Sequence, residues 1–121
     1  MIEVMKGLPP HVAAFIATGK ITRQDYDEVI YPIVDQVYKD FGKINYLLLL
    51  NTPLQNYSAG AWMKDALLGF IYVTEWRKIA IVSEKENIRT FTNVFGKFIP
   101  GRSRGFKLND LELAEKWVSE L

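Results

Sequence analysis

Residues 44–50 read INYLLLL, and this stretch decides the fold class. Its apolar side chains are continuous rather than alternating, which is typical of a strand that is covered on both faces of a sheet. A second run of this kind, WRKIAIV, occupies residues 76–82. Apolar residues at helical spacing lie before, between and after the two runs. The sequence therefore predicts an α/β fold, with a mostly parallel sheet and flanking helices.

The segment before this strand predicts an amphipathic helix from Thr22 to Gly42. Thr22 is the expected N-cap, with Asp25 three residues later as its partner in a capping box. Gly42 supplies the stop at the other end. Pro32 lies inside the helix and removes one backbone hydrogen bond. Because the apolar stripe keeps its phase across Pro32, we expect a kinked helix rather than two separate ones.

The remaining elements complete a mixed sheet with four flanking helices. Two apolar runs, at 2–5 and 12–17, predict an N-terminal antiparallel hairpin with a tight turn. The order is β-β-α-β-α-β-α-β-α, and no repeat or linker interrupts it, so we expect one domain over residues 1–121. The later elements expected are a helix at 59–73, a helix at 87–98, a short strand at 105–108 and a last helix capped by Asn109 or Asp110.

The composition excludes several kinds of site. Fifteen Lys and Arg residues against fourteen Asp and Glu residues give a net charge of +1, so nothing points to nucleic acid. The absence of Cys rules out disulfides and thiolate chemistry, and the single His11 argues against a His-based metal site or a catalytic triad. We therefore expect no metal, no cofactor and no enzymatic activity. An enzymatic alternative would depend on Asp65, Glu84 and Glu86.

The chain has no apolar run of the length of a signal peptide or a membrane span. We expect a cytoplasmic protein. Peripheral contact with a membrane is a second possibility, which depends on which side chains the folded protein exposes.

Five blocks spread over the whole chain carry a family resemblance. The blocks are MIEVMKGLP (1–9), ATGKITRQDYDEVIYP (17–32), GKINYLLLL (42–50), SAGAWMKDALLGF (58–70) and FGKFIPG (95–101). They resemble the STAS fold of anti-sigma-factor antagonists and, more closely, the SpoIIAA-like family of small bacterial proteins. The resemblance implies a non-enzymatic domain used for protein–protein regulation or for binding an apolar ligand. At the level of fold alone, the family also resembles the lipid-binding CRAL-TRIO domain.

Ser58 lies where the classical STAS antagonists carry a serine that a partner kinase phosphorylates. That resemblance implies a protein-interaction switch, because a phosphate adds a charge of roughly −1.5 to −2 at a helix N-terminus. In this sequence Asn56 replaces the acidic residue of the classical pattern. The residues alone favour the simpler interpretation, in which Ser58 caps the helix that follows it.

The second and third long helices carry more apolar residues than one stripe against the sheet requires. Trp62, Met63 and Phe70 lie on the first of them, and Phe91 and Phe95 on the other. Three interpretations stay open: core packing with scattered surface aromatics, a homodimer face, or a groove between the two helices for an apolar or lipid-like ligand.

The segment Lys97–Lys107 holds four positive charges and no acidic residue, with aromatic residues interleaved. It could contact anionic lipid headgroups or a membrane surface, where each cation contributes about 1 kcal/mol. Arg102 and Arg104 could also clamp a carboxylate or phosphate headgroup. The simpler interpretation is a solvated loop that leads into an edge strand.

Overall fold

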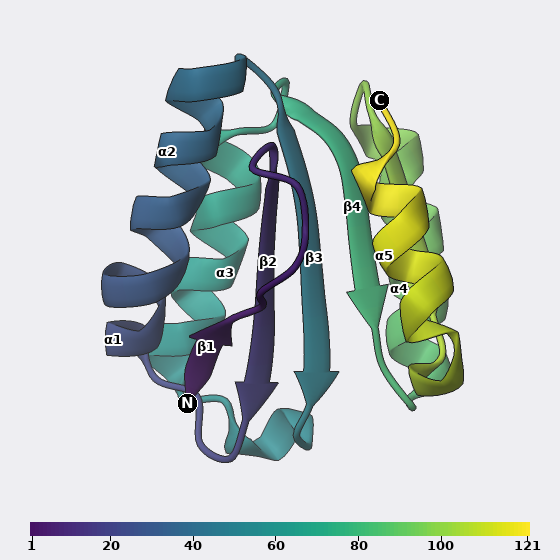
Figure 1. Ribbon diagram of the computed structural model, residues 1–121. Helices are drawn as coiled ribbons and strands as arrows, with labels where there is room; N and C mark the ends of the chain where they lie inside the picture. The colour runs from purple at the N-terminus through teal and green to yellow at the C-terminus, as the bar shows by residue number, and fades with distance from the viewer.

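The computed structural model describes all residues from 1 to 121. Its sheet has five strands, and each strand lies beside its neighbour in the chain (Figure 1). The first pair is antiparallel and the other pairs are parallel, so the predicted mixed sheet is confirmed. The strands are β1 (Ile2–Val4), β2 (Val12–Thr18), β3 (Ile44–Asn51), β4 (Trp76–Val82) and β5 (Arg102–Phe106).

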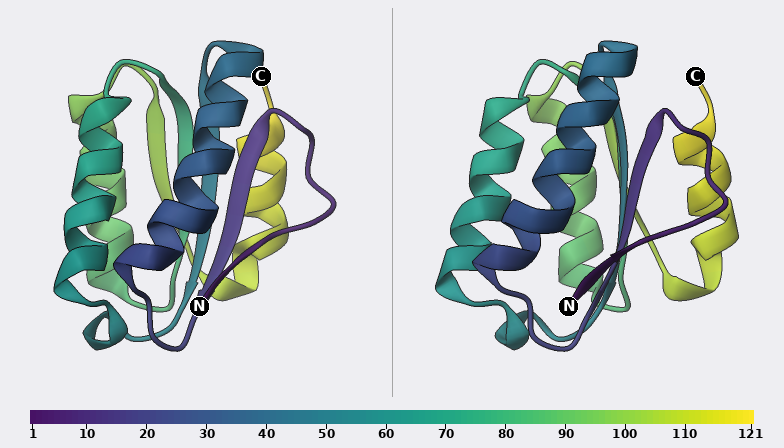
Figure 2. Two further views of the ribbon diagram at one scale, coloured as in Figure 1. Left: turned by 90° about the vertical axis from the view of Figure 1, so that its left-hand side faces the viewer. Right: turned by 60° about the vertical axis from the view of Figure 1, so that its left-hand side comes forward.

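Helices connect the parallel strands. Because the sheet grows in one direction from β2 to β5, right-handed crossovers place the connecting helices on the same side. Figure 2 shows α3 and α4 on one side of the sheet and α5 on the other. The helices are α1 (Arg23–Asp25), a π-helical segment (Tyr26–Ile30), α2 (Tyr31–Phe41), α3 (Ala59–Ile71), α4 (Glu86–Phe95) and α5 (Leu111–Ser119).

β3 is the central strand, as its continuous apolar run predicted. All its residues from Ile44 to Leu50 are buried. Alternate side chains of β3 enter two cores, one beneath α2 and α3 and one beneath α5. Burial on both faces favours apolar residues at successive positions, which explains the absence of alternation; the one polar residue in this stretch, Asn45, donates a 2.7 Å hydrogen bond to the Val118 carbonyl.

The helical region before β3 is not split at Pro32. A capping box between Thr22 and Asp25 opens it, and Gly42 closes it at a φ of 76°, both as predicted. Pro32 is the second residue of α2, and the π-helical segment runs directly into α2 before it. A wider turn of this kind absorbs the irregularity that a proline introduces.

Three predicted boundaries were wrong. The hairpin turn is not tight, because residues 5–11 form a long connection between β1 and β2 that packs Met5 and Leu8 on the core beneath α5. The last strand is Arg102–Phe106 rather than 105–108, since polar and glycine residues make an edge strand without an apolar signal. α4 ends at Phe95, and a 3-10 turn covers Gly96–Phe98.

Candidate functional site

α3 is an apolar helix that the sheet barely covers. Only Ala61 and Leu68 are buried among its residues. Met63 is 70% exposed and Phe70 is 76% exposed, and Trp62 is also exposed. The excess of apolar side chains predicted for this helix is therefore confirmed as exposed surface.

α4 adds a second apolar stripe. Arg89, Asn93 and Gly96 contact β5, because their side chains or backbone lie against Ser103 and Gly105 of that strand. Helical spacing then places positions 91 and 94 on the side of α4 that faces away from β5, and position 98 follows in the 3-10 turn after α4. These residues are Phe91, Val94 and Phe98, and all three are exposed.

We call these exposed side chains of α3 and α4 the apolar face. Phe95 lies at its inner margin, where it packs on the core and stacks on Phe91 with ring centroids 6.3 Å apart. Of the residues predicted to bind a ligand, Trp62, Met63, Phe70 and Phe91 thus share one side of the molecule with Phe95. The apolar face comprises Trp62, Met63, Leu67, Phe70, Ile71, Phe91, Val94 and Phe98.

Polar contacts fasten α3 to the segment before α2. The Tyr26 hydroxyl donates a 2.8 Å hydrogen bond to the Asp65 carboxylate. Tyr31 donates to the Lys64 carbonyl at 2.6 Å, and the Lys64 ammonium lies 2.8 Å from the Asp27 carboxylate. Burial raises the pKa of Asp65, while the hydrogen bond from Tyr26 lowers it less strongly. Asp65 was considered only as one of three carboxylates for an enzymatic alternative, because nothing in a single sequence pairs it with Tyr26.

Tyrosines surround this contact. Burial raises the pKa of Tyr57 to about 12 and that of Tyr26 still further, and the negative charge of Asp65 adds to both effects. Tyr46 is buried on β3, and its hydroxyl has no hydrogen-bond partner. Phenols with raised pKa values stay protonated at neutral pH and act here as donors and packing groups. The cluster therefore positions α3.

Ser58 caps α3. Its hydroxyl accepts a 3.0 Å hydrogen bond from the Ala61 N–H, which confirms the predicted N-cap. Its own N–H donates to the Ile21 carbonyl at 2.9 Å, so the loop before α3 is tied to the end of β2. Ser58 is exposed. Its use as a phosphorylation site stays a prediction.

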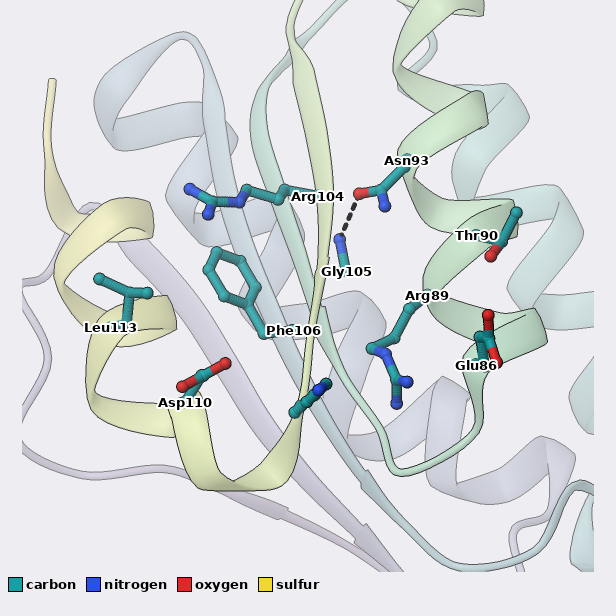
Figure 3. Close-up of a pocket in the computed structure, with 10 residues that line it drawn as sticks. Glu86, Arg89, Thr90, Asn93, Arg104, Gly105, Phe106, Asp110 and Leu113 are labelled. Atoms are coloured by element: carbon teal, nitrogen blue, oxygen red, sulfur yellow. Dashed lines mark hydrogen bonds between the residues drawn. The ribbon is translucent and has the colours of Figure 1, made fainter.

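The structure does not bring Arg102 and Arg104 to the apolar face. Alternation along β5 places both on the side of Phe106, which lies in the core beneath α5. The Arg104 guanidinium lies over the Phe106 ring at 4.7 Å (Figure 3). The predicted site of apolar side chains with an arginine clamp is thus divided between two sides of the sheet.

A polar hollow of about 490 Å³ opens beside Arg104, between α4, β5 and the start of α5 (Figure 3). Arg89 donates from its guanidinium to the Ser83 carbonyl at 2.8 Å, and Asn93 accepts from the Gly105 N–H at 2.9 Å. The positive charges that line this hollow are balanced in part by Glu86 and Asp110, which line it as well. The hollow is therefore a contact zone between elements with mixed charge.

A second hollow, of about 570 Å³, lies where β3, β4 and β5 begin. We call its cationic side chains the basic end: Lys43, Arg77, Lys78 and Arg102. Arg102 was predicted as a candidate site residue, whereas Lys43, Arg77 and Lys78 were not. The available signal was the pair Arg77–Lys78 at the start of an otherwise apolar strand.

The carboxylates that an enzymatic alternative needs do not converge. Glu84 and Glu86 are exposed after β4, whereas Asp65 is bound to Tyr26 on α3. No group of three or more His, Cys, Asp or Glu side chains could hold a metal ion. None of the helices is long and apolar enough to cross a membrane.

Comparison with known proteins agrees with this architecture. The family profile described as SpoIIAA-like matches residues 12–119. A crystal structure of an uncharacterised protein of the DUF3478 family from Shewanella loihica PV-4, described as having a SpoIIAA-like fold, is 25% identical. The alignment covers 97% of this chain and 93% of that one, with a TM-score of 0.68. A comparison with the curated proteins found no match. The chain belongs to the SpoIIAA-like family.

Proposed function

We propose that this protein is a non-catalytic, STAS-like binding module that docks on the surface of an anionic membrane through its apolar face. The observation that carries the proposal is the exposure of that face. Phe70 and Phe98 are 76% and 73% exposed, and Phe91 is 70% exposed. Large rings that are bare to this degree and gathered on one side mark an interaction surface.

Lys97 beside the face, and cations at one end of the molecule, favour an anionic partner. Lys97 immediately precedes Phe98, and the basic end lies at the same end of the molecule as the last turn of α3 (Figure 1). The helices α2, α3 and α4 end where the parallel strands begin. Of the acidic residues at this end, Asp35 is paired with Lys39 and Glu75 with Lys43; the others are Asp40 and Glu120.

The free energy available from the exposed rings and the nearby cations is sufficient for reversible membrane binding. Burying a fully exposed Phe ring contributes about 2 kcal/mol, so the exposed parts of three rings supply roughly 4–5 kcal/mol. Each cation near an anionic surface adds about 1 kcal/mol. The sum corresponds to binding in the micromolar to millimolar range, which suits a peripheral contact rather than a permanent anchor.

A lipid surface suits the geometry better than an enclosed ligand. The rings of the apolar face point outward, and the two hollows described above are polar and lie elsewhere. A fatty-acid-like molecule would need side chains that surround it on several sides. A second copy of the chain could cover the same face, and the experiment below separates the two.

The test is sedimentation with vesicles. The wild-type protein should pellet with phosphatidylglycerol vesicles and much less with phosphatidylcholine vesicles. The double variant Phe70→Ser and Phe98→Ser should bind about a hundredfold more weakly, because it loses roughly 3 kcal/mol of apolar burial. Leu113→Ser is the matched control, since Leu113 is 49% exposed on α5, on the other side of the sheet.

Two results would contradict the proposal. One is equal binding by the double variant and the wild type. The other is a wild-type protein that ignores both vesicles and sediments at twice its mass of 13.9 kDa, with the double variant monomeric. That second outcome would assign the face to a homodimer.

A further inference from the structure

The hollow at the basic end concentrates positive charge in a chain whose net charge is only +1. Lys43 precedes β3, Arg77 and Lys78 lie at the start of β4, and Arg102 opens β5. No acidic side chain lines the hollow, and its remaining walls are Trp76, Pro100, Gly101 and Leu121.

A β-bulge at Arg77 brings two consecutive cations into this hollow. Ile44 of β3 pairs with Trp76, but the next residue, Asn45, pairs with Lys78, so Arg77 is the extra residue. In a regular strand, Trp76 and Lys78 would point to the same side. Here Trp76 lies in the core beneath α3, whereas the Lys78 ammonium reaches the Trp117 carbonyl of α5. The bulge thus redirects the strand so that Arg77 and Lys78 line the same hollow.

Gly101 lets β5 start close to β4, and this brings the fourth cation, Arg102, to the hollow. A Cβ atom at position 101 would lie 2.1 Å from the Trp76 carbonyl oxygen, so only glycine fits against the start of β4. The close approach lets β5 begin in register, with Arg102 directly beside Lys78. The hollow is therefore built by backbone features and not by the chance spread of flexible side chains.

Two of the four cations are held in place and two have no partner. Lys43 donates to the Thr74 carbonyl at 2.9 Å and lies 3.7 Å from Glu75. Lys78 donates to the Trp117 carbonyl at 2.9 Å. The guanidinium groups of Arg77 and Arg102 form no hydrogen bond or ion pair within the chain. Each therefore keeps its forked set of N–H donors available to a ligand.

We propose that this hollow binds a phosphate monoester. Two free guanidinium groups can each donate two parallel hydrogen bonds to phosphate oxygens, and two ammonium groups add charge beside them. A monoester carries a charge of roughly −1.5 to −2 at neutral pH, which matches four cations better than the single charge of a carboxylate or phosphodiester does. The monoester could be a free metabolite-like phosphate or the headgroup of a lipid.

The first experiment is a titration with glycerol 3-phosphate, followed by amide chemical shifts in ¹⁵N-labelled protein. Shifts should concentrate at the starts of β4 and β5. The variant Arg77→Gln/Arg102→Gln should bind at least about tenfold more weakly. Arg104→Gln is the matched control, because Arg104 lies on the same strand and side but outside the hollow, and it should change the affinity less than about twofold.

The variant Arg77→Lys/Arg102→Lys keeps the charge but loses the paired donors. Its affinity for glycerol 3-phosphate should lie between those of the wild type and the glutamine variant, because the site uses the paired donors as well as the charge. The proposal is overturned if glycerol 3-phosphate causes no shifts in folded wild-type protein. It is equally overturned if Arg104→Gln weakens binding as much as the double variant, or if dimethyl phosphate binds as tightly.

Vesicles separate the two sources of the monoester. Stronger sedimentation with phosphatidic acid than with phosphatidylglycerol at matched charge, lost in Arg77→Gln/Arg102→Gln, would assign a lipid headgroup. Binding of glycerol 3-phosphate without such a preference would assign a free phosphate. The preference for phosphatidic acid over phosphatidylglycerol, a diester, tests this site, whereas the loss of binding in Phe70→Ser/Phe98→Ser tests docking of the apolar face, so the two proposals can fail separately.

Discussion

Asp65 offers the sharpest test of how α3 is held on the molecule. The substitution Asp65→Ala removes the acceptor of the Tyr26 hydrogen bond and leaves a hydroxyl with Tyr57 as its only other contact, at 3.5 Å. Tyr26 is fully buried. An unpartnered buried hydroxyl costs about 1–3 kcal/mol. At roughly 4 °C per kcal/mol for a chain of this size, the Tm of Asp65→Ala should lie about 4–12 °C below that of Asp65→Asn, which also lacks the charge but keeps the acceptor.

Asp65→Asn should stabilise the folded state, unlike Asp65→Ala. Asparagine retains an oxygen that accepts from Tyr26 but carries no charge. Burial raises the pKa of Asp65 above its ordinary value of 3.8, so the folded state binds the proton more tightly than the unfolded chain does. The carboxylate therefore opposes folding above that value, and the cost grows as pH rises through the folded-state pKa. We expect Asp65→Asn to be more stable than the wild type at neutral pH, with the advantage lost below about pH 4.

Urea unfolding followed by circular dichroism, at acidic and neutral pH, measures both effects. The reasoning is refuted if Asp65→Asn is less stable than the wild type at neutral pH, or if its advantage does not depend on pH. It is also refuted if the alanine and asparagine variants unfold alike, since the hydrogen bond from Tyr26 would then contribute nothing.

Other substitutions test single features of the fold. Ser58→Ala should cost about 1 kcal/mol of stability because it removes the cap on the Ala61 N–H. Ser58→Asp should be nearly neutral, since aspartate and serine both cap well, and thermal melts of the two variants test both expectations. Gly69→Ala meets no atom within 4 Å and should stabilise α3 by about 0.5–1 kcal/mol in urea unfolding. Gly101→Ala should prevent normal folding or lower Tm severely, because its Cβ would collide with the Trp76 carbonyl.

Much of the fold could be predicted because local patterns and the tertiary structure agree. The continuous apolar run of β3 indicated a covered strand, and Thr22 and Gly42 marked the ends of the first long helical region. β5 was misplaced because an edge strand lacks a core-facing pattern. The apolar excess of α3 and α4 was visible in the sequence, but whether the fold itself covers it was not.

The site was harder to predict than the fold because it depends on distant pairings. Arg102 and Arg104 were predicted to clamp the anionic headgroup of a ligand with an apolar tail, yet the alternation of β5 turns them to the side of the sheet away from the apolar face. The bulge at Arg77, which builds the basic end, arises from the pairing of β4 with β3. No periodicity within one segment encodes such a register shift.

The most direct test of the membrane proposal uses the absence of cysteine from the chain. A fluorescent label is placed on Val94→Cys, on the apolar face, or on Leu113→Cys, on α5. The two positions are 43% and 49% exposed, so they start from similar environments. With anionic vesicles that contain brominated acyl chains, the label at position 94 should be quenched and the label at position 113 should not. Quenching at position 113 instead, or equal quenching at both, would contradict docking through α3 and α4.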